Sequence, residues 1–334
     1  MRIAVTRRAD ITCIDGVNRF IYVLAEGLEN LGHKVFLIGH TARYQKKAIE
    51  IFGPKVKEAY KLSSKESNYA KIAIDWLFKG SLLIKRLKID AILMNGIVPI
   101  LSSKLKVAIC HGVFESKYTR IGSLLYNTCD IVVCVSSKLR NELRMRGIII
   151  PIPIKISLYK ARPLEEREPL ILHVGTRPVK NPEISIKAVK ILREKGYNLR
   201  LLIAGPLRSD LPKYDFVNYT YEVPEVSLRE IYSRALALML PSSYEAFPYV
   251  TLEASASGTP VIVSSAVPPE AVIDNVTGFV VKGLDPEAYA EKIELLLNDE
   301  ELWKELSRKA LEHSKRYDVS IVAKQWENVI KQAC

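Results

Sequence analysis

The feature that most constrains the fold is an alternation of apolar strands and amphipathic helices that occurs twice along the 334 residues. In the first half, an apolar run at 2–5 precedes a helical pattern at 17–31 and a second apolar run at 34–39. Further apolar runs follow at 91–95, 106–110 and 131–135, and the last leads into a helical stretch ending at Gly147. Strands that alternate with helices predict a parallel sheet covered on both faces.

The same alternation restarts after a proline-rich, charge-dense segment at 151–169. Strands are predicted at 170–175, 199–205, 235–240 and 260–264, and helices at 182–196, around Glu253, at 286–297 and at 300–316. The predicted fold class is α/β, with two Rossmann-like, doubly wound domains that face each other across a ligand cleft. The predicted domains are 1–155 and 156–317, with the tail 318–334 free to pack back on the first.

The charge of the chain is shared unevenly. Residues 1–168 carry 29 Lys and Arg against 15 Asp and Glu, a net charge of +14, whereas the remaining residues have a net charge of −2. A basic half indicates an anionic partner, either a membrane surface or an acidic ligand. The alternative is a lysine-rich surface of the kind found in heat-stable proteins. Basic residues are not interleaved with aromatic ones, so nucleic acid is not an expected partner.

The N-terminus and the cysteines bear on location. The first apolar run has four residues and is followed by charges, which is not the pattern of a signal peptide. No apolar stretch approaches the roughly 20 residues of a membrane span. The five cysteines are scattered and none has the spacing of a metal or redox pair. We expect a cytoplasmic protein, and a peripheral position on the inner membrane face stays open.

The segment PSSYEAFPYVTLEASASGTPV at 241–261 places two glutamates, Glu245 and Glu253, eight positions apart. Pro248 puts Glu245 in the loop that follows a strand, and Glu253 in the first turns of the next helix. Free backbone N–H groups at a helix N-terminus favour phosphate, and carboxylates accept hydrogen bonds from sugar hydroxyls. The alternative is an ordinary loop residue and a solvated helix residue.

This segment resembles the signature of the retaining, nucleotide-sugar-dependent glycosyltransferases of family four, which have the GT-B fold. The resemblance runs from about residue 1 to 320. Other segments that resemble the family, in its order, are LAEGLENLGHKV (24–35), CHG (110–112), VSSKLRNEL (135–143), VGTRPVKNPEISIKAV (174–189) and DNVTGFVV (274–281).

The resemblance implies four catalytic residues. Glu245 would bind hydroxyls of the transferred sugar, and His111 would lie under that sugar. Arg177 and Lys180 would neutralise the diphosphate, as cations do for departing phosphates generally.

The resemblance also implies a set of donor-binding residues. Glu253 would bind the ribose hydroxyls, and a glycine in the first loop would let the backbone approach the ligands closely. The donor-binding set is Gly16, Ala246, Phe247, Thr251 and Glu253.

The reaction implied is the transfer of a hexose from a UDP- or GDP-linked donor to an acceptor hydroxyl, with retention, on a glycan or lipid-linked acceptor. No Asp-x-Asp motif occurs, so we expect neither a metal site nor a cofactor. Two rivals remain. One is a catalytically inactive homologue that acts as a binding subunit, and the other is a nucleotide-sugar epimerase of the same fold.

The segment 66–88 is predicted as an amphipathic helix with a second apolar stripe. Ile74, Phe78 and Leu82 fall opposite the core-facing side, among basic residues. Another segment such as the C-terminal tail could cover this stripe, or the helix could break at Gly80. Otherwise the stripe would enter a membrane interface while the lysines meet anionic headgroups.

Overall fold

The computed structural model describes residues 1–65, 68–112, 126, 128–206, 208–221 and 223–333. The chain divides into two compact units, Met1–Pro153 with Val319–Cys334 (unit 1) and Ile154–Asp318 (unit 2). The expected boundary lies within two residues of this division. Among the described residues, no helix combines the length and apolar character needed to cross a membrane.

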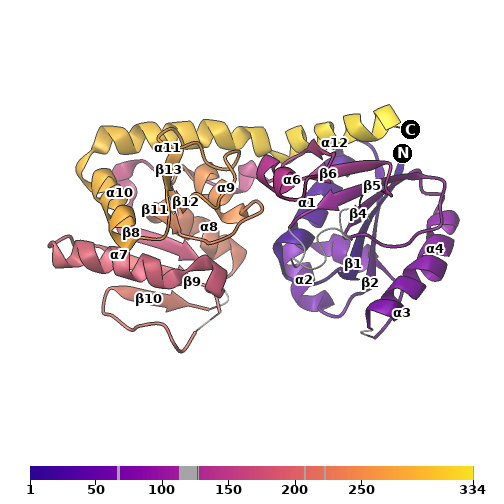
Figure 1. The fold of residues 1–334 in the computed structure, drawn as a ribbon, viewed down its shortest axis with the longest axis horizontal. Coiled ribbons are helices and arrows are strands. Elements are labelled where there is room, and N and C mark those ends of the chain that lie inside the picture. The colour runs from indigo at the N-terminus through magenta and orange to yellow at the C-terminus, as the bar shows by residue number, and fades with distance from the viewer. Residues whose placement is uncertain (66–67, 113–125, 127, 207, 222, 334) are drawn as a thin grey trace. The chain divides into compact units, whose positions relative to one another are not determined.

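Unit 1 is built on a seven-stranded parallel sheet with the strand order β3-β2-β1-β4-β5-β6-β7 (Figure 1). Its central strands are apolar and buried, as expected of a sheet covered on both faces. The strands are β1 Arg2–Asp10, β2 Lys34–Thr41, β3 Tyr60–Lys61, β4 Ala91–Asn95, β5 Leu105–Cys110, β6 Ile131–Cys134 and β7 Ile148–Ile149. The described helices are α1 Gly16–Asn30, α2 Gln45–Phe52, α3 Tyr69–Asp75, α4 Ser81–Arg86, α6 Ser137–Glu142 and α12 Val319–Ala333.

The C-terminal helix α12 belongs to unit 1 because it packs closely on α1. A side chain at Gly27 of α1 would lie 2.7 Å from Val319 and 2.8 Å from Ala323, so the missing Cβ lets the two helices meet. Trp326 is fully buried, with its ring centre 6.1 Å from that of Phe20. The tail therefore lies on α1.

The segment 66–88 is not one regular helix. Residues 66 and 67 lie outside the described part of the chain, and a π-helical turn, Trp76–Gly80, joins α3 to α4. The Trp76 ring fits against Gly80, where a Cβ would lie 2.8 Å from it. The helical run continues through Gly80, so the alternative of a break at this glycine was wrong.

Unit 2 is built on a six-stranded parallel sheet with the strand order β10-β9-β8-β11-β12-β13. Helix α7 packs on α10. The apolar core of the unit includes Trp303 and Leu306 of α11. The strands are β8 Glu168–Val174, β9 Arg200–Ala204, β10 Val217–Thr220, β11 Ala235–Leu240, β12 Val261–Ser264 and β13 Gly278–Val281. The helices are α7 Pro182–Glu194, α8 Glu225–Arg234, α9 Tyr249–Ala256, α10 Pro286–Asn298 and α11 Glu300–Ser314.

The predicted α/β class is confirmed, since both units are parallel sheets of the Rossmann type with helices as connections. Most predicted elements lie within two residues of their observed bounds. Two were wrong in length: β1 runs to Asp10 rather than ending at residue 5, and α6 ends at Glu142 rather than at Gly147. Arg144 has a φ of 50°, a left-handed conformation that a helix cannot include.

Candidate functional site

The loop that follows β8 carries the predicted phosphate-binding cations of unit 2. Gly175 has a φ of 101°, and a Cβ there would lie 3.2 Å from the Lys180 side chain. Glycine is thus needed both for the turn and for the path of the lysine. After a short 3₁₀ turn, Pro178–Lys180, the left-handed Asn181 starts α7 at Pro182. The loop therefore connects β8 to the N-terminus of α7 through a conformationally restricted turn.

Lys180 and Glu245 form the central ion pair of unit 2. The Lys180 Nζ lies 2.5 Å from Glu245 Oε1, and both side chains are largely buried. The Ser242 hydroxyl also donates to Glu245 Oε1, at 2.7 Å. Because a buried ion pair of this kind is costly to desolvate, it is weak evidence of stability. A carboxylate and an ammonium held side by side do offer one acceptor and one cation to a ligand.

The two loops that supply this pair are joined by hydrogen bonds. The Ser243 N–H donates to the Val179 carbonyl at 2.8 Å, and Asn181 Nδ2 donates to the Pro241 carbonyl at 2.8 Å. The Lys180 loop and the Glu245 loop thus hold each other in place, which preorganises the ion pair.

Glu253 lies on α9, as predicted, and its side chain points into unit 2. It is 2% exposed and accepts hydrogen bonds from Tyr159 at 3.1 Å and from Tyr232 at 2.7 Å. The alternative of a solvated helix residue is therefore wrong. The two tyrosines were missed from sequence, because they lie 94 and 21 positions away from Glu253.

The three residues between the glutamates that were predicted to bind the donor differ in environment. Ala246 is half-buried. Phe247 is buried, and its ring packs edge-on against Tyr317 with centres 5.7 Å apart. Thr251 is fully buried, and its hydroxyl donates to the Pro248 carbonyl at 2.8 Å. This bond closes the first turn of α9, so the hydroxyl of Thr251 supports the helix start.

Arg177 and Arg208 are two further cations at the Lys180 loop. Arg177 is exposed and precedes the 3₁₀ turn. The Arg208 side chain donates to the Thr176 carbonyl at 3.2 Å and pairs with Asp210 at 2.5 Å. Sequence reasoning missed Arg208, since it follows a different strand.

A buried histidine holds the Lys180 loop in place through hydrogen bonds. His173 accepts from the Ser185 hydroxyl at 2.7 Å through Nδ1, and its Nε2–H donates to the Gly175 carbonyl at 2.8 Å. Burial lowers the pKa of His173 to about 4, so its ring is neutral at neutral pH. A histidine within an otherwise apolar strand was the signal that could have revealed it.

His111 follows β5 at the edge of the unit 1 sheet. Asn95 at the end of β4 donates its amide N–H to the Thr6 carbonyl at 3.1 Å, so its carbonyl oxygen faces His111 Nε2 at 2.7 Å. This arrangement requires the proton on Nε2 and makes Nδ1 the unprotonated nitrogen. Burial and the charge of Arg7 lower the pKa of His111 to about 3. The ring is therefore a neutral hydrogen-bonding group.

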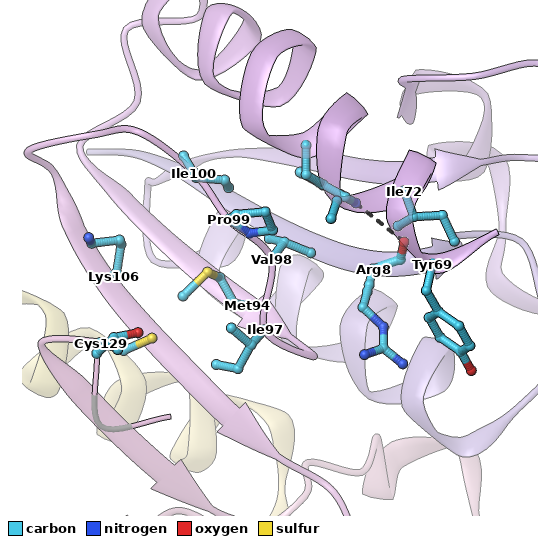
Figure 2. A pocket seen from close by; sticks show the side chains of 13 residues that line it. Arg8, Tyr69, Ile72, Met94, Ile97, Val98, Pro99, Ile100, Lys106 and Cys129 are labelled. Atoms are coloured by element: carbon cyan, nitrogen blue, oxygen red, sulfur yellow. Dashed lines mark hydrogen bonds between the residues drawn. The ribbon is translucent and has the colours of Figure 1, made fainter. Parts of the chain in front are cut away.

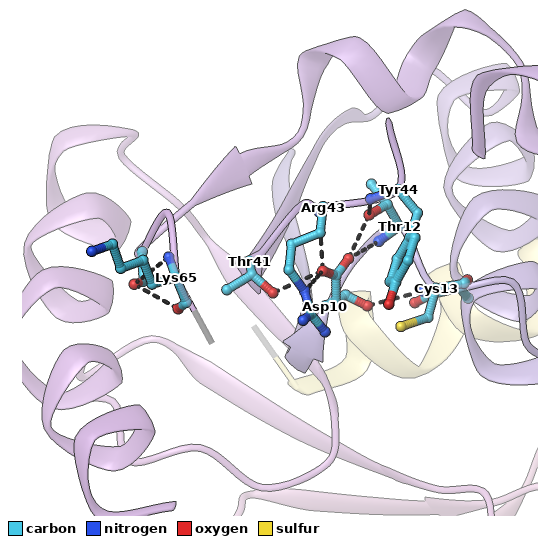
Figure 3. Close-up of polar contacts among 9 residues, drawn as sticks. Asp10, Thr12, Cys13, Thr41, Arg43, Tyr44 and Lys65 are labelled. Carbon is cyan, nitrogen blue, oxygen red and sulfur yellow. Dashed lines mark hydrogen bonds and ion pairs between the residues drawn. The ribbon is translucent and has the colours of Figure 1, made fainter. Parts of the chain in front are cut away.

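The first loop of unit 1 is held by the buried carboxylate of Asp10 (Figure 3). It accepts from the N–H and the hydroxyl of Thr12, from the Thr41 hydroxyl at 2.8 Å, and from Arg43. These hydrogen bonds lower the pKa of Asp10, although burial opposes them. The network connects the end of β1 to the end of β2, at the edge where His111 also lies.

Gly16 is exposed and is the first residue of α1, one position earlier than the predicted helix start. Asp15 before it caps the helix by accepting from the Asn18 N–H at 2.8 Å, and it pairs with Arg7 at 2.8 Å. Gly16 is thus a helix residue rather than a loop residue.

Unit 1 also has a cavity of about 460 Å³ under α3. Its walls are mostly apolar, with Trp76 and Met94 among them. Figure 2 shows Arg8 and Tyr69 at one side and Lys106 and Cys129 at the other. Within the described residues, no group of three or more His, Cys, Asp or Glu side chains is arranged to hold a metal ion.

Two family models together cover residues 14–313. "Glycosyltransferase Family 4" matches 14–156, and "Glycosyl transferases group 1" matches 157–313. The D-inositol 3-phosphate glycosyltransferase of Corynebacterium glutamicum is 31% identical over 173 residues, which are 47% of this chain and 41% of that protein. The chain thus spans about two fifths of the length of this curated relative.

Solved structures share the fold over the whole chain. Sucrose-phosphate synthase from Thermosynechococcus elongatus has a TM-score of 0.80 at 17% identity, covering 99% of this chain and 98% of its own. Anabaena HepE, solved in complex with UDP-glucose, has a TM-score of 0.81 at 15% identity, covering 99% of this chain and 100% of its own. These matches define the fold as that of the GT-B glycosyltransferases. The chain belongs to glycosyltransferase family four.

Proposed function

We propose that this chain is a retaining glycosyltransferase that moves a hexose from a UDP- or GDP-linked donor to an acceptor hydroxyl of a glycan or of a lipid-linked acceptor. The observation that carries the proposal is the Lys180–Glu245 pair, held between two interlocked loops, together with the buried Glu253 on α9. Membership of family four and the UDP-glucose complex of HepE support it.

The donor is assigned to unit 2. On donor binding, the Lys180 ammonium would exchange part of its ion pair with Glu245 for an ion pair with the diphosphate. Glu245 would then accept hydrogen bonds from sugar hydroxyls. Glu253 would accept from the ribose hydroxyls, in place of or beside the two tyrosines. Arg177 and Arg208 would add positive charge near the phosphates.

The acceptor is assigned to the first loop of unit 1, which ends at Asp15, and to Gly16 at the start of α1, with His111 as a neutral hydrogen-bonding group. In the reaction the acceptor oxygen forms a bond to the anomeric carbon on the face that the diphosphate leaves. The bond from that carbon to the phosphate oxygen breaks, and the acceptor proton passes to the departing diphosphate. Lys180 offsets the charge that develops there.

A screen of UDP- and GDP-hexoses tests the proposal. A donor that binds the native state raises the unfolding temperature, and incubation with it should release the nucleoside diphosphate and give an α-linked product from an α-linked donor. Interconversion of the donor sugar without nucleotide release would instead identify an epimerase. Binding without release, hydrolysis or transfer for any acceptor would identify an inactive binding subunit.

A further inference from the structure

The outer face of α3, the π-helical turn and α4 exposes a row of large apolar side chains. Ile74, Phe78 and Leu82 are 55%, 65% and 67% exposed, and they recur every fourth residue. Leu101 is 71% exposed and is held next to α4, because its N–H donates to the Ser81 hydroxyl at 2.8 Å. We call these four residues the apolar row.

The π-helical turn helps to align the apolar row. A π turn closes its hydrogen bonds over five residues, so each residue turns less about the axis than in an α-helix. Residues four apart therefore stack closer to one line along the helix. On the buried side, Trp76 anchors this turn, since its Nε1–H donates to the Arg8 carbonyl at 3.3 Å. The anchored ring keeps the opposite side of the helix facing outward.

The charges around the apolar row are of one sign. Residues 68–88, all of which the structure describes, contain one acid, Asp75, and it is buried against His40 and Lys79. The exposed charged side chains of this segment are all cations: Lys71, Lys79, Lys85, Arg86 and Lys88. Unit 1 as a whole carries 27 Lys and Arg against 13 Asp and Glu, a net charge of +14.

Nothing in unit 1 that the structure describes covers this face. The C-terminal tail, which could have done so, packs on α1. A second copy is a poor occupant, because a symmetric contact would bring the same cations against each other. An anionic lipid surface matches both parts of the face, since apolar side chains enter the acyl boundary while lysines meet the headgroups.

We propose that the apolar row and its surrounding cations form a docking face for an anionic membrane. The helix would lie in the plane of the interface. The inference goes beyond the proposed sugar transfer and does not depend on it. It would hold unit 1 at the lipid surface, within reach of acceptors that are anchored there.

Sedimentation with vesicles tests the docking face. At about 50 mM salt, where charges act over longer distances, the protein should sediment with phosphatidylcholine vesicles that contain about one third phosphatidylglycerol. Binding should fall at least tenfold with pure phosphatidylcholine vesicles or in about 0.5 M salt. The assay contains no sugar donor, so its result is independent of the transfer reaction.

Two variants and two matched controls locate the face. The double variant Phe78→Asp/Leu82→Asp should lose vesicle binding at least tenfold, and Lys85→Glu/Arg86→Glu should lose it to a similar degree. Val226→Asp and Lys213→Glu change an exposed apolar residue and an exposed lysine of unit 2 and should bind as the unaltered protein does. An unchanged unfolding temperature in every variant would show that each is folded.

Three outcomes would overturn the proposal. The first is no binding of the unaltered protein to anionic vesicles at low salt. The second is equal loss in the unit 2 controls. The third is self-association of the unaltered protein that Phe78→Asp abolishes without any vesicle binding, which would make a second copy the occupant.

Discussion

Each unit has a neutral histidine at the carboxyl end of its sheet, but the two rings are anchored differently. In unit 2, His173 is fully buried, and both of its ring nitrogens bond to groups that fix the Lys180 loop. In unit 1, His111 is half-buried, and Nε2 bonds to Asn95, a side chain at the end of the neighbouring strand. A histidine at a strand end therefore has no fixed role. His173 supports the Lys180 loop, whereas His111 is the residue that we propose contacts a ligand.

The largest effect is expected at Lys180, the cation on the loop that His173 supports. Lys180→Ala should lower turnover about a hundredfold, because it removes charge from the departing diphosphate and leaves Glu245 buried without its cation. Lys187→Ala, an exposed lysine on α7, is the matched control and should change turnover little. Initial rates at saturating donor check this. Equal effects of the two substitutions would show that Lys180 is not part of the active site.

The two glutamates of unit 2 should separate into different roles. Glu253→Gln should weaken binding of free UDP or GDP by about 1.5–3 kcal/mol, the range for hydrogen bonds to a charged group. Glu245→Gln should leave that binding intact and reduce sugar transfer. Calorimetric titration with the nucleotide alone measures the first effect, and Tyr232→Phe controls for the lost tyrosine contact. Similar losses of nucleotide affinity in both glutamate variants would contradict the division.

The lowered pKa of His173 should make the free energy of unfolding depend on pH. His173 has a folded pKa of about 4 against an unfolded value of about 6.5, so its contribution to stability is full above pH 6.5 and is lost as the pH falls toward 4. At pH 5 the loss is about 2 kcal/mol, because the unfolded chain binds a proton that the folded chain does not. Unfolding temperatures of the unaltered protein and of His173→Gln between pH 7 and 5 measure this.

His173→Gln should show a weaker dependence of unfolding temperature on pH. His111 stays neutral down to a pKa of about 3, so it should give transfer activity no transition between pH 5 and 8. An activity transition in that interval that disappears in His111→Asn would show that ligand binding changes the charge of this ring.

The smallest effect expected is none. If Lys180 and the neighbouring arginines offset the charge of the diphosphate, excess EDTA should leave transfer unchanged. Rates before and after chelation, with manganese added back, test this. Loss of activity in EDTA that manganese restores would mean that a metal ion, and not Lys180 with the arginines, offsets the charge of the diphosphate.

The parts of the fold that could be predicted are those with an apolar signal. β4 and β11 are uniformly buried, and each appears in the sequence as a continuous apolar run. The edge strand β3 is two exposed residues and left no such run. The π-helical turn has no periodicity of its own, so 66–88 was read as one helix.

The candidate site was predictable only where its residues lie close together in sequence. Glu245, Glu253 and Lys180 belong to segments with recognisable motifs. Tyr159, Tyr232 and Arg208 come from other elements and reach the site through folding. No local pattern identifies such contacts, because they depend on strand order and helix packing.

The return of α12 to unit 1 affects the order in which the protein can fold as it is synthesised. Unit 2 is one continuous segment, so all of its residues have been synthesised before the last helix of unit 1 is made. Domains usually fold from the N-terminus onward, but here the earlier half must wait with the α12 side of α1 uncovered. Gly27, Phe20 and their neighbours are then open to solvent and to chaperones until Trp326 arrives. The first unit to begin is thus the last to be completed.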